Sequence, residues 1–470
     1  MKNTRRVAGN LVSLFSGEAV SSILAFVITI LLARRLTDEG FGRLAFVQSI
    51  MVYLALVMDM GLGTFGAREI ARRPESLAEY SSAIFSLRLL LGAAVALPFA
   101  VIVAVWPMPA EMRWLCWGSA LGIFTQALNP EFAFQGSERM SGIAIWRVLV
   151  HLFYLTLIGV IVTDRGELWV VPLLRFAAEA ITLILIAVFL LKKHTHMPTF
   201  VWRPVVWHGY LRESLAMAAS VVVIKIYYTF DTIILGIIHT PSDVGIYQAA
   251  YKIILPFSST VSLALMVFAP YFSRYWRDPE SMIRVIKNYA ILLIYIGSVT
   301  SIPLILLHKK LIFMIYGSLY LNAKIPLLLL AISLFLTFLS AVFLGPLLFS
   351  GKQKKYLLFL AIQAGLSIVL NLILIPPFGY VGAASVAIAS SIFLLIISAV
   401  DFCRDYRDTS VIKIMGQLTL LASFVVFILQ LCVQNNWLHS ALFMSLFSVM
   451  IYTLYHDRFV AIYKSIINRS

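Results

Sequence analysis

Three basic side chains interrupt apolar runs of this chain, and their chemistry favours ligand binding inside a membrane. Arg88, Lys225 and Lys252 each lie within an apolar stretch of more than 20 residues. A lone charge at the bilayer centre costs about 2.5–3.5 kcal/mol, so such cations should line a cavity or pair with acids. In a partly dehydrated cavity they would form charge-assisted hydrogen bonds with an anion. These three cations, together with Arg147, are therefore candidate binding residues.

Four other side chains are candidates for gating or for coupling to an ion. They are Glu18, Asp59, His151 and Asp231. Each also has an ordinary interpretation, because buried acids often pair or cap helices and a buried histidine is more often a satisfied hydrogen-bond donor than a proton carrier. Asp231 and Lys252 lie at similar depths on the two arms of one predicted hairpin. They would form either a structural salt bridge or a gated pair that opens for an anionic head group.

Other patterns point away from enzymatic chemistry. Arg175 and Glu179 are four residues apart on one predicted helix and are interpreted as a structural pair. The three cysteines contain no C-x-x-C pair, so no metal site is predicted. Gly61 to Gly66 matches G-x-G-x-x-G, but it closes an apolar helix rather than following a strand of a βαβ unit. We predict no enzyme and no cofactor, with H⁺ or Na⁺ as the only coupling ions considered.

Composition identifies the elements that must position these residues. Hydrophobic residues make up 61% of the chain, charged residues 13%, and the mean hydropathy is +0.92. Charged residues usually reach ~25%, so a soluble fold could not cover itself. We predict an all-α polytopic membrane protein with about fourteen spans. They lie near 11–33, 43–63, 81–105, 113–134, 143–163, 168–191, 214–238, 246–272, 288–307, 325–349, 356–375, 380–402, 413–433 and 439–456.

The distribution of lysine and arginine predicts the orientation. With both termini in the cytoplasm, the inner segments hold 25 of the 37 basic residues and the outer segments hold 8. This asymmetry is the positive-inside signature. The net charge of +15 is then explained by loops that face anionic membrane lipids, and no nucleic-acid partner is predicted.

Internal similarity predicts two lobes. Placing Gly42 on Gly245 aligns Thr37 with Thr240, and FQGSERM at 134–140 matches FSGKQKK at 349–355. Two six-helix halves of the same orientation would produce this pattern. The predicted divisions are an N-terminal lobe at 1–195, a C-terminal lobe at 196–405, and two additional helices with a cytoplasmic tail at 406–470.

Five segments together resemble a known family. They are LLARRLTDEGFGRLAFVQSI (31–50), DMGLGTFGAREIAR (59–72), NPEFAFQGSERM (129–140), DTIILGIIHTPSDVGIYQAAYKI (231–253) and PPFGYVGAA (376–384). The combination is similar to the bacterial oligosaccharide flippases, the O-antigen and polysaccharide-transport branch of the multidrug/oligosaccharidyl-lipid/polysaccharide (MOP) exporter superfamily. The resemblance extends over about residues 5–455.

The resemblance implies a function. The chain would move undecaprenyl-pyrophosphate-linked oligosaccharide repeat units from the cytoplasmic to the periplasmic leaflet of the inner membrane, by alternating access through a cationic central cavity and with ion-gradient coupling. By motif position Asp231 is the family-like acid of the seventh span. Membrane lipids and other polysaccharide assembly proteins are the implied partners. A lipid II flippase and a drug/cation antiporter of the same superfamily remain as alternatives.

Overall fold

The structure, a computed structural model, consists of helices throughout the part of the chain that it describes. That part comprises residues 2–163, 168–192, 198–432, 438, 440–451 and 453, in which no strand occurs. The α-helices are α1 (Lys2–Asp59), α2 (Leu62–Arg72), α3 (Leu77–Val105), α4 (Ala110–Ala127), α5 (Glu131–Gly136), α6 (Met140–Ile161), α7 (Val170–Lys192), α8 (Pro204–Ile238), α9 (Pro241–Tyr275), α10 (Pro279–Tyr316), α11 (Lys324–Phe349), α12 (Gln353–Tyr406) and α13 (Ser410–Cys432). Two 3-10 helices, η1 (Pro74–Ser76) and η2 (Ser318–Ala323), complete the described elements.

The length and hydropathy of these helices confirm a multi-pass membrane protein. Ten helical stretches of the described residues are long and apolar enough to cross a membrane. The all-α prediction is confirmed, and the number of fourteen spans stays a prediction. The ten stretches are fewer than the fourteen predicted spans partly because α1 and α12 each contain two predicted spans.

Two long helices are broken internally. Helix α1 covers the first two predicted spans and breaks at Thr37, where φ is 67°. Helix α12 covers the eleventh and twelfth predicted spans and breaks at Gly379, where φ is 55°. Glycine adopts positive φ without steric cost, and the preceding Pro376 and Pro377 lack the N–H that a continuous helix needs. His239 Nε2 donates to the carbonyl of Ile375 at 2.8 Å beside this break.

The helices divide into two compact units. Unit 1 comprises residues 1–236 and 240–245, and unit 2 comprises 237–239 and 246–469. Almost all of α8 therefore belongs to unit 1, whereas the predicted C-terminal lobe begins at residue 196. The division into two equivalent six-helix lobes stays a prediction.

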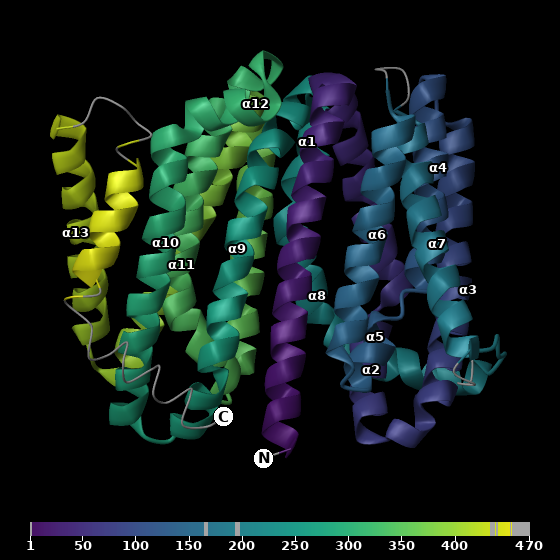
Figure 1. The fold of residues 1–470 in the computed structure, drawn as a ribbon, viewed down its shortest axis with the longest axis horizontal. Coiled ribbons are helices and arrows are strands. Elements are labelled where there is room, and N and C mark those ends of the chain that lie inside the picture. The colour runs from purple at the N-terminus through teal and green to yellow at the C-terminus, as the bar shows by residue number, and fades with distance from the viewer. Residues whose placement is uncertain are drawn as a thin grey trace. The chain divides into compact units, whose positions relative to one another are not determined.

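In unit 1, α3, α4, α6 and α7 stand side by side, with the short helices α2 and α5 packed together at one end (Figure 1). Helix α2 is strongly amphipathic: it buries Leu62, Phe65 and Ile70 and leaves Arg72 exposed. These apolar side chains contact α3, Phe132 of α5 and Trp207 of α8 in one core cluster.

The segment 198–203, which leads into α8, is fastened to α3. The backbone N–H of Thr199 donates to Ser82 Oγ at 3.1 Å, and that of Val201 donates to Ser86 Oγ at 2.9 Å. Both serine side chains are buried. The hydroxyls therefore give hydrogen-bond partners to backbone groups of a segment that lies outside a helix.

In unit 2, α11 is the most enclosed helix and packs against both α10 and α12. Phe338 of α11 closely approaches Gly297 of α10, where an added Cβ would lie 2.9 Å from the Phe338 side chain. Helix α13 packs on α10. Tyr295 of α10 forms a 2.9 Å hydroxyl–hydroxyl hydrogen bond with Ser448 on the following apolar helix.

The two aligned repeat segments contact each other within unit 1. A Cβ on Gly42 would lie 1.7 Å from the carbonyl oxygen of Pro241, and a Cβ on Gly245 would lie 2.0 Å from that of Asp38. Ser242 Oγ donates a hydrogen bond to the Asp38 carboxylate. The contact is reciprocal, because each glycine meets the carbonyl four residues before the other. Two equivalent segments related by a local two-fold axis give this pattern.

The close approach at Gly245 makes a prediction about stability. We expect Gly245→Ala to destabilise the protein by about 1–3 kcal/mol, because the added methyl meets backbone that cannot rotate away. The exposed α13 residue Gly416 has no atom within 4 Å of an added Cβ, so Gly416→Ala is the matched control. Thermal unfolding of the purified protein in detergent should give a lower Tm for Gly245→Ala only. Equal Tm values for the two variants would contradict the close contact between Gly245 and the Asp38 carbonyl.

Candidate functional site

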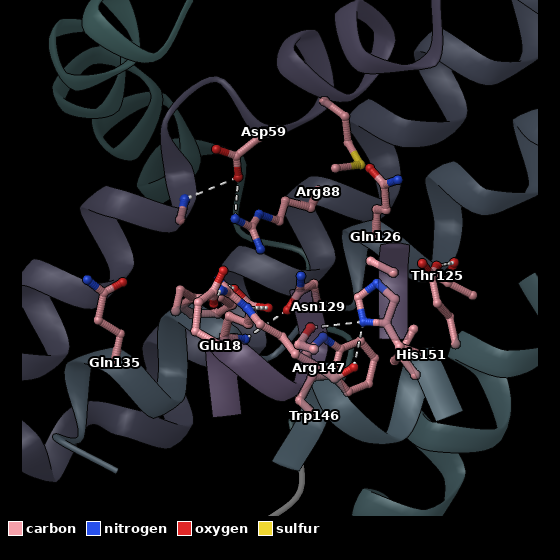
Figure 2. Close-up of a pocket in the computed structure, with 18 of the residues that line it drawn as sticks. Glu18, Asp59, Arg88, Thr125, Gln126, Asn129, Gln135, Trp146, Arg147 and His151 are labelled. Carbon is pink, nitrogen blue, oxygen red and sulfur yellow. Dashed lines mark hydrogen bonds and ion pairs between the residues drawn. The ribbon is translucent and has the colours of Figure 1, made fainter. Parts of the chain in front are cut away.

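Unit 1 contains a polar cavity of about 730 Å³. Its walls come from α1, α2, α3, α4, α5, α6, α7 and α8 (Figure 2). The lining residues with polar side chains include Glu18, Ser21, Ser22, Asp59, Thr64, Arg88, Thr125, Gln126, Asn129, Glu131, Gln135, Arg147, His151, Arg175, Glu179 and Lys225. Six of the eight predicted binding, gating and coupling residues thus lie together, along with both members of the predicted structural pair.

Arg88 is buried and paired with Asp59. Its side chain is 7% exposed, and its Nη2 donates to Asp59 Oδ1, while the guanidinium lies 4.9 Å from the Phe132 ring centroid. Asp59 Oδ1 also accepts the N–H of Gly63 at 3.2 Å. The pairing joins the end of the second predicted span to the third span.

Arg147 lies at the centre of a three-residue ion cluster. Its Nε and Nη2 donate to the two carboxylate oxygens of Glu131 at 2.9 and 2.8 Å, the forked geometry that arginine favours. Its Nη1 donates to Glu18. The cluster ties α1, α5 and α6 together, and its side chains remain 26–39% exposed to the cavity.

Arg175 and Glu179 form the predicted structural pair. Arg175 Nε donates to Glu179 Oε1 at 2.7 Å, one turn along α7. The other carboxylate oxygen of Glu179 accepts the hydroxyl of Thr125 from α4. The Arg175 guanidinium lies 5.4 Å from the Tyr154 ring centroid. Glu179 is therefore fully engaged by its neighbours.

His151 is held by its Nδ1. This atom lies 2.9 Å from the carbonyl oxygen of Arg147 and 3.0 Å from Ser21 Oγ. A carbonyl can only accept, so the short contact to Arg147 is satisfied when Nδ1 carries the hydrogen. The Nε2 atom is then left to exchange a proton or to accept a hydrogen bond. Its predicted role in coupling stays a prediction.

Lys225 differs from the other cations of the cavity. Its side chain is exposed, and no ion pair with it occurs among the described residues. Counting the lining groups gives four cations, Arg88, Arg147, Arg175 and Lys225, against four acids, Glu18, Asp59, Glu131 and Glu179. The cavity of unit 1 is thus balanced in formal charge, and the cationic character inferred from the sequence stays a prediction.

The remaining two predicted residues lie elsewhere. Asp231 is buried in unit 1 and accepts from Thr232, from the backbone N–H at 2.6 Å and from the hydroxyl at 3.1 Å. Lys252 belongs to unit 2. The predicted pairing of Asp231 with Lys252 across one hairpin therefore stays a prediction.

Sequence reasoning did not identify Glu131, Thr125 or Gln135 as cavity residues. Glu131 follows Asn129-Pro130 near the end of a predicted span, and Asn129 Oδ1 caps it by accepting its backbone N–H at 2.9 Å. An acid at that boundary looks like an ordinary interfacial residue. Its importance comes from Arg147, sixteen residues later, which the turn after α5 brings back onto it.

The glycine pattern rejected as a nucleotide motif has three separate packing roles. Gly61 has φ of 81° and forms the turn between α1 and α2. A Cβ on Gly63 would lie 2.6 Å from Arg88 Nη2, and one on Gly66 would lie 2.4 Å from Ile84. Gly63 thus leaves the space in which Arg88 reaches Asp59.

The Arg88–Asp59 pair makes a prediction testable by a double-mutant cycle. Arg88→Met should destabilise the protein by about 2 kcal/mol, less than the ~3–5 kcal/mol for breaking a fully buried pair, because Asp59 is 33% exposed. Adding Asp59→Asn should recover most of the loss, since no charge is then left unpaired. Thermal unfolding of the four proteins gives the coupling. Strictly additive losses would show that the pair is not coupled.

Comparisons with known proteins agree with this architecture. Residues 7–276 match the family described as "Polysaccharide biosynthesis protein". A relative from Escherichia coli (strain K12), described as "Putative O-antigen transporter", is 24% identical over 371 residues, which cover 76% of this chain and 88% of the relative.

Solved structures show the same fold. "Lipid II flippase MurJ, inward closed conformation" superposes with a TM-score of 0.74 at 13% identity, covering 95% of this chain and 99% of that structure. An inward-facing multidrug resistance MATE family transporter of the MOP superfamily gives a TM-score of 0.62 at 13% identity, covering 81% and 94%. These similar proteins are transporters and flippases rather than enzymes, in agreement with the prediction from the sequence. The chain belongs to the polysaccharide biosynthesis protein family and has the fold of the MOP superfamily transporters.

Proposed function

We propose that the chain translocates undecaprenyl-pyrophosphate-linked oligosaccharide repeat units from the cytoplasmic to the periplasmic leaflet of the bacterial inner membrane. The observation that carries this proposal is the polar cavity of about 730 Å³ among the helices of unit 1, in a member of a polysaccharide biosynthesis family. The similarity to an O-antigen transporter supports the same substrate class.

The chemistry of the cavity suits such a substrate. A glycan head group is covered with hydroxyls, and each hydroxyl that enters hydrocarbon without a partner costs several kcal/mol. A wall of carboxamides, hydroxyls and ion pairs replaces the lost water hydrogen bonds. The polyprenyl tail is itself apolar, so it stays in lipid while the head group crosses.

The proposed mechanism is alternating access, with the polar site exposed to one side of the membrane at a time. Glu18, Asp59 and His151 are the proposed coupling groups for H⁺ or Na⁺, because ion binding at either carboxylate would compete with its ion pair and because His151 Nε2 is left to take up a proton. Both chain termini are proposed to be cytoplasmic, and other polysaccharide assembly proteins are proposed partners.

Two members of the same superfamily suggest the alternatives. A lipid II flippase shares the fold, and rescue of peptidoglycan synthesis in cells depleted of their own lipid II flippase would favour it. A drug/cation antiporter predicts efflux of cationic drugs and a cavity in which acids outnumber cations. The equal numbers of acids and cations here do not favour that alternative.

Deleting the protein makes the first functional prediction. A strain without it should accumulate undecaprenyl-linked glycan on the cytoplasmic leaflet, and the full-length chain should relieve that accumulation. The leaflet that holds the glycan can be determined in right-side-out spheroplasts, where glycan on the cytoplasmic leaflet is protected from an externally added glycosidase. Normal surface glycan without accumulation in the deletion strain would overturn the proposed function.

The second functional prediction concerns Lys225. Because it is the exposed cavity cation with no described ion-pair partner, Lys225→Ala should lower the rate of glycan export by roughly tenfold, the effect of one charge-assisted hydrogen bond. Lys225→Arg should retain most activity. Lys354→Ala, at an exposed lysine outside the cavity, is the control. Export unchanged in Lys225→Ala, with normal protein levels, would remove Lys225 from the site.

A further inference from the structure

The polar groups of the unit 1 cavity fall into two classes. The charged side chains other than Lys225 are engaged internally, by the pairs Arg88–Asp59 and Arg175–Glu179 and by the cluster around Arg147. The neutral carboxamides are less engaged in the described part of the chain. No side-chain hydrogen bond of Gln126 or Gln135 occurs among the described residues, and both residues are exposed although they line the cavity.

Asn129 adds a third carboxamide with free capacity. Its Oδ1 is used to cap α5, but in the described part of the chain its Nδ2 donates to nothing. Gln126 on α4 and Gln135 on α5 lie on opposite sides of the charged pairs, with Asn129 between them (Figure 2). In the described part of the chain, the groups that remain available to a ligand therefore include three carboxamides, the Lys225 ammonium and His151 Nε2.

This distribution distinguishes between parts of a lipid-linked glycan. A pyrophosphate bound at the arginines would lie beside the four carboxylates that pair with them, and repulsion between these like charges would weaken its binding. An uncharged sugar meets no such repulsion. Its hydroxyls can both donate and accept, as a carboxamide can, so each free Gln or Asn can bind adjacent hydroxyls.

We propose that Gln126, Asn129 and Gln135 form a subsite for the uncharged sugar residues next to the lipid pyrophosphate, with Lys225 alone facing the phosphate. The subsite rests on the proposed function and adds a selectivity to it. A uronic acid or other acidic sugar in this position would lie among Glu18, Glu131 and Asp59 with one unpaired cation to offset its charge, and it binds more weakly.

The experiment measures binding by the full-length protein in detergent, followed by its tryptophan fluorescence. Three soluble probes share a farnesyl pyrophosphate: one has no sugar, one has a neutral disaccharide of N-acetylhexosamine and hexose, and one has the same disaccharide with a uronic acid in place of the hexose. The proteins are wild type, the double variant Gln126→Ala/Gln135→Ala, and the control Gln417→Ala at an exposed α13 position outside the cavity.

We expect wild type to bind the neutral disaccharide probe best and the acidic one at least several-fold more weakly. The double variant should lose about tenfold in affinity for the neutral probe, as expected for two or more neutral hydrogen bonds, while its affinity for farnesyl pyrophosphate stays unchanged. Among the described residues neither glutamine side chain forms a hydrogen bond, so the Tm of the double variant should equal that of wild type.

Two results would overturn the subsite. One is wild-type affinity of the double variant for the neutral probe, and the other is equal or tighter binding of the acidic probe by wild type. Either result leaves the proposed flippase function standing, because pyrophosphate-linked probes still bind. Failure of all three probes to bind wild type would instead count against both the subsite and the proposed function.

Discussion

The structure depends on the absence of water from the hydrocarbon core. An ionisable side chain in that region has to be satisfied by the protein itself or by a polar cavity, because hydrocarbon offers it nothing. Unit 1 meets this requirement with ion pairs that join different helices. Arg147 alone links α1, α5 and α6 through Glu18 and Glu131. The same pairs that make these charges tolerable therefore also hold the walls of the cavity in place.

Close helix approach complements these charges. Gly42 and Gly245 bring two turns into backbone contact, and Gly63 leaves room for the Arg88 guanidinium. Without a hydrophobic driving force between helices in lipid, small residues allow the van der Waals contact that stabilises packing. A glycine beside an arginine has a second use here, since the missing side chain allows the guanidinium to reach a carboxylate on a neighbouring helix. The short segment from Asp59 to Gly63 thus contributes both the carboxylate and the space that the Arg88 ion pair needs.

Much of the helical architecture was predictable from the sequence, because hydropathy reports directly on membrane helices, whereas the orientation inferred from charge asymmetry stays a prediction. The i, i+4 pair of Arg175 and Glu179 was also predictable, since its geometry is local to one helix. The partners of Arg88 and Arg147 were not. Asp59 and Glu18 were singled out only as buried acids, and Glu131 was missed, because which acid meets which base depends on packing between helices 16 to 129 residues apart in the chain.

The sequence also could not show whether the polar segment between predicted spans one and two forms a loop or a sharp break between two helical parts. In the structure the two helical parts of α1 meet directly at a break at Thr37, whose backbone angles are non-helical. Nor could composition show that the cavity's cations are matched by equal numbers of acids. That balance emerges only when side chains from eight helices are placed around one space.

The segment 198–203, fastened to α3, has a geometric consequence for the site. Ser82 and Ser86 are four residues apart on α3, ~6 Å along its axis, and accept the N–H groups of Thr199 and Val201. Helix α8 begins at Pro204, immediately after this anchored segment. Lys225 lies roughly 31 Å along α8 from this anchored start. Each residue inserted or deleted between Pro204 and Lys225 would shift the lysine by ~1.5 Å along the helix axis and rotate it by ~100° around that axis. The hydroxyl groups of Ser82 and Ser86 thus help to fix the position of the Lys225 ammonium group in the cavity.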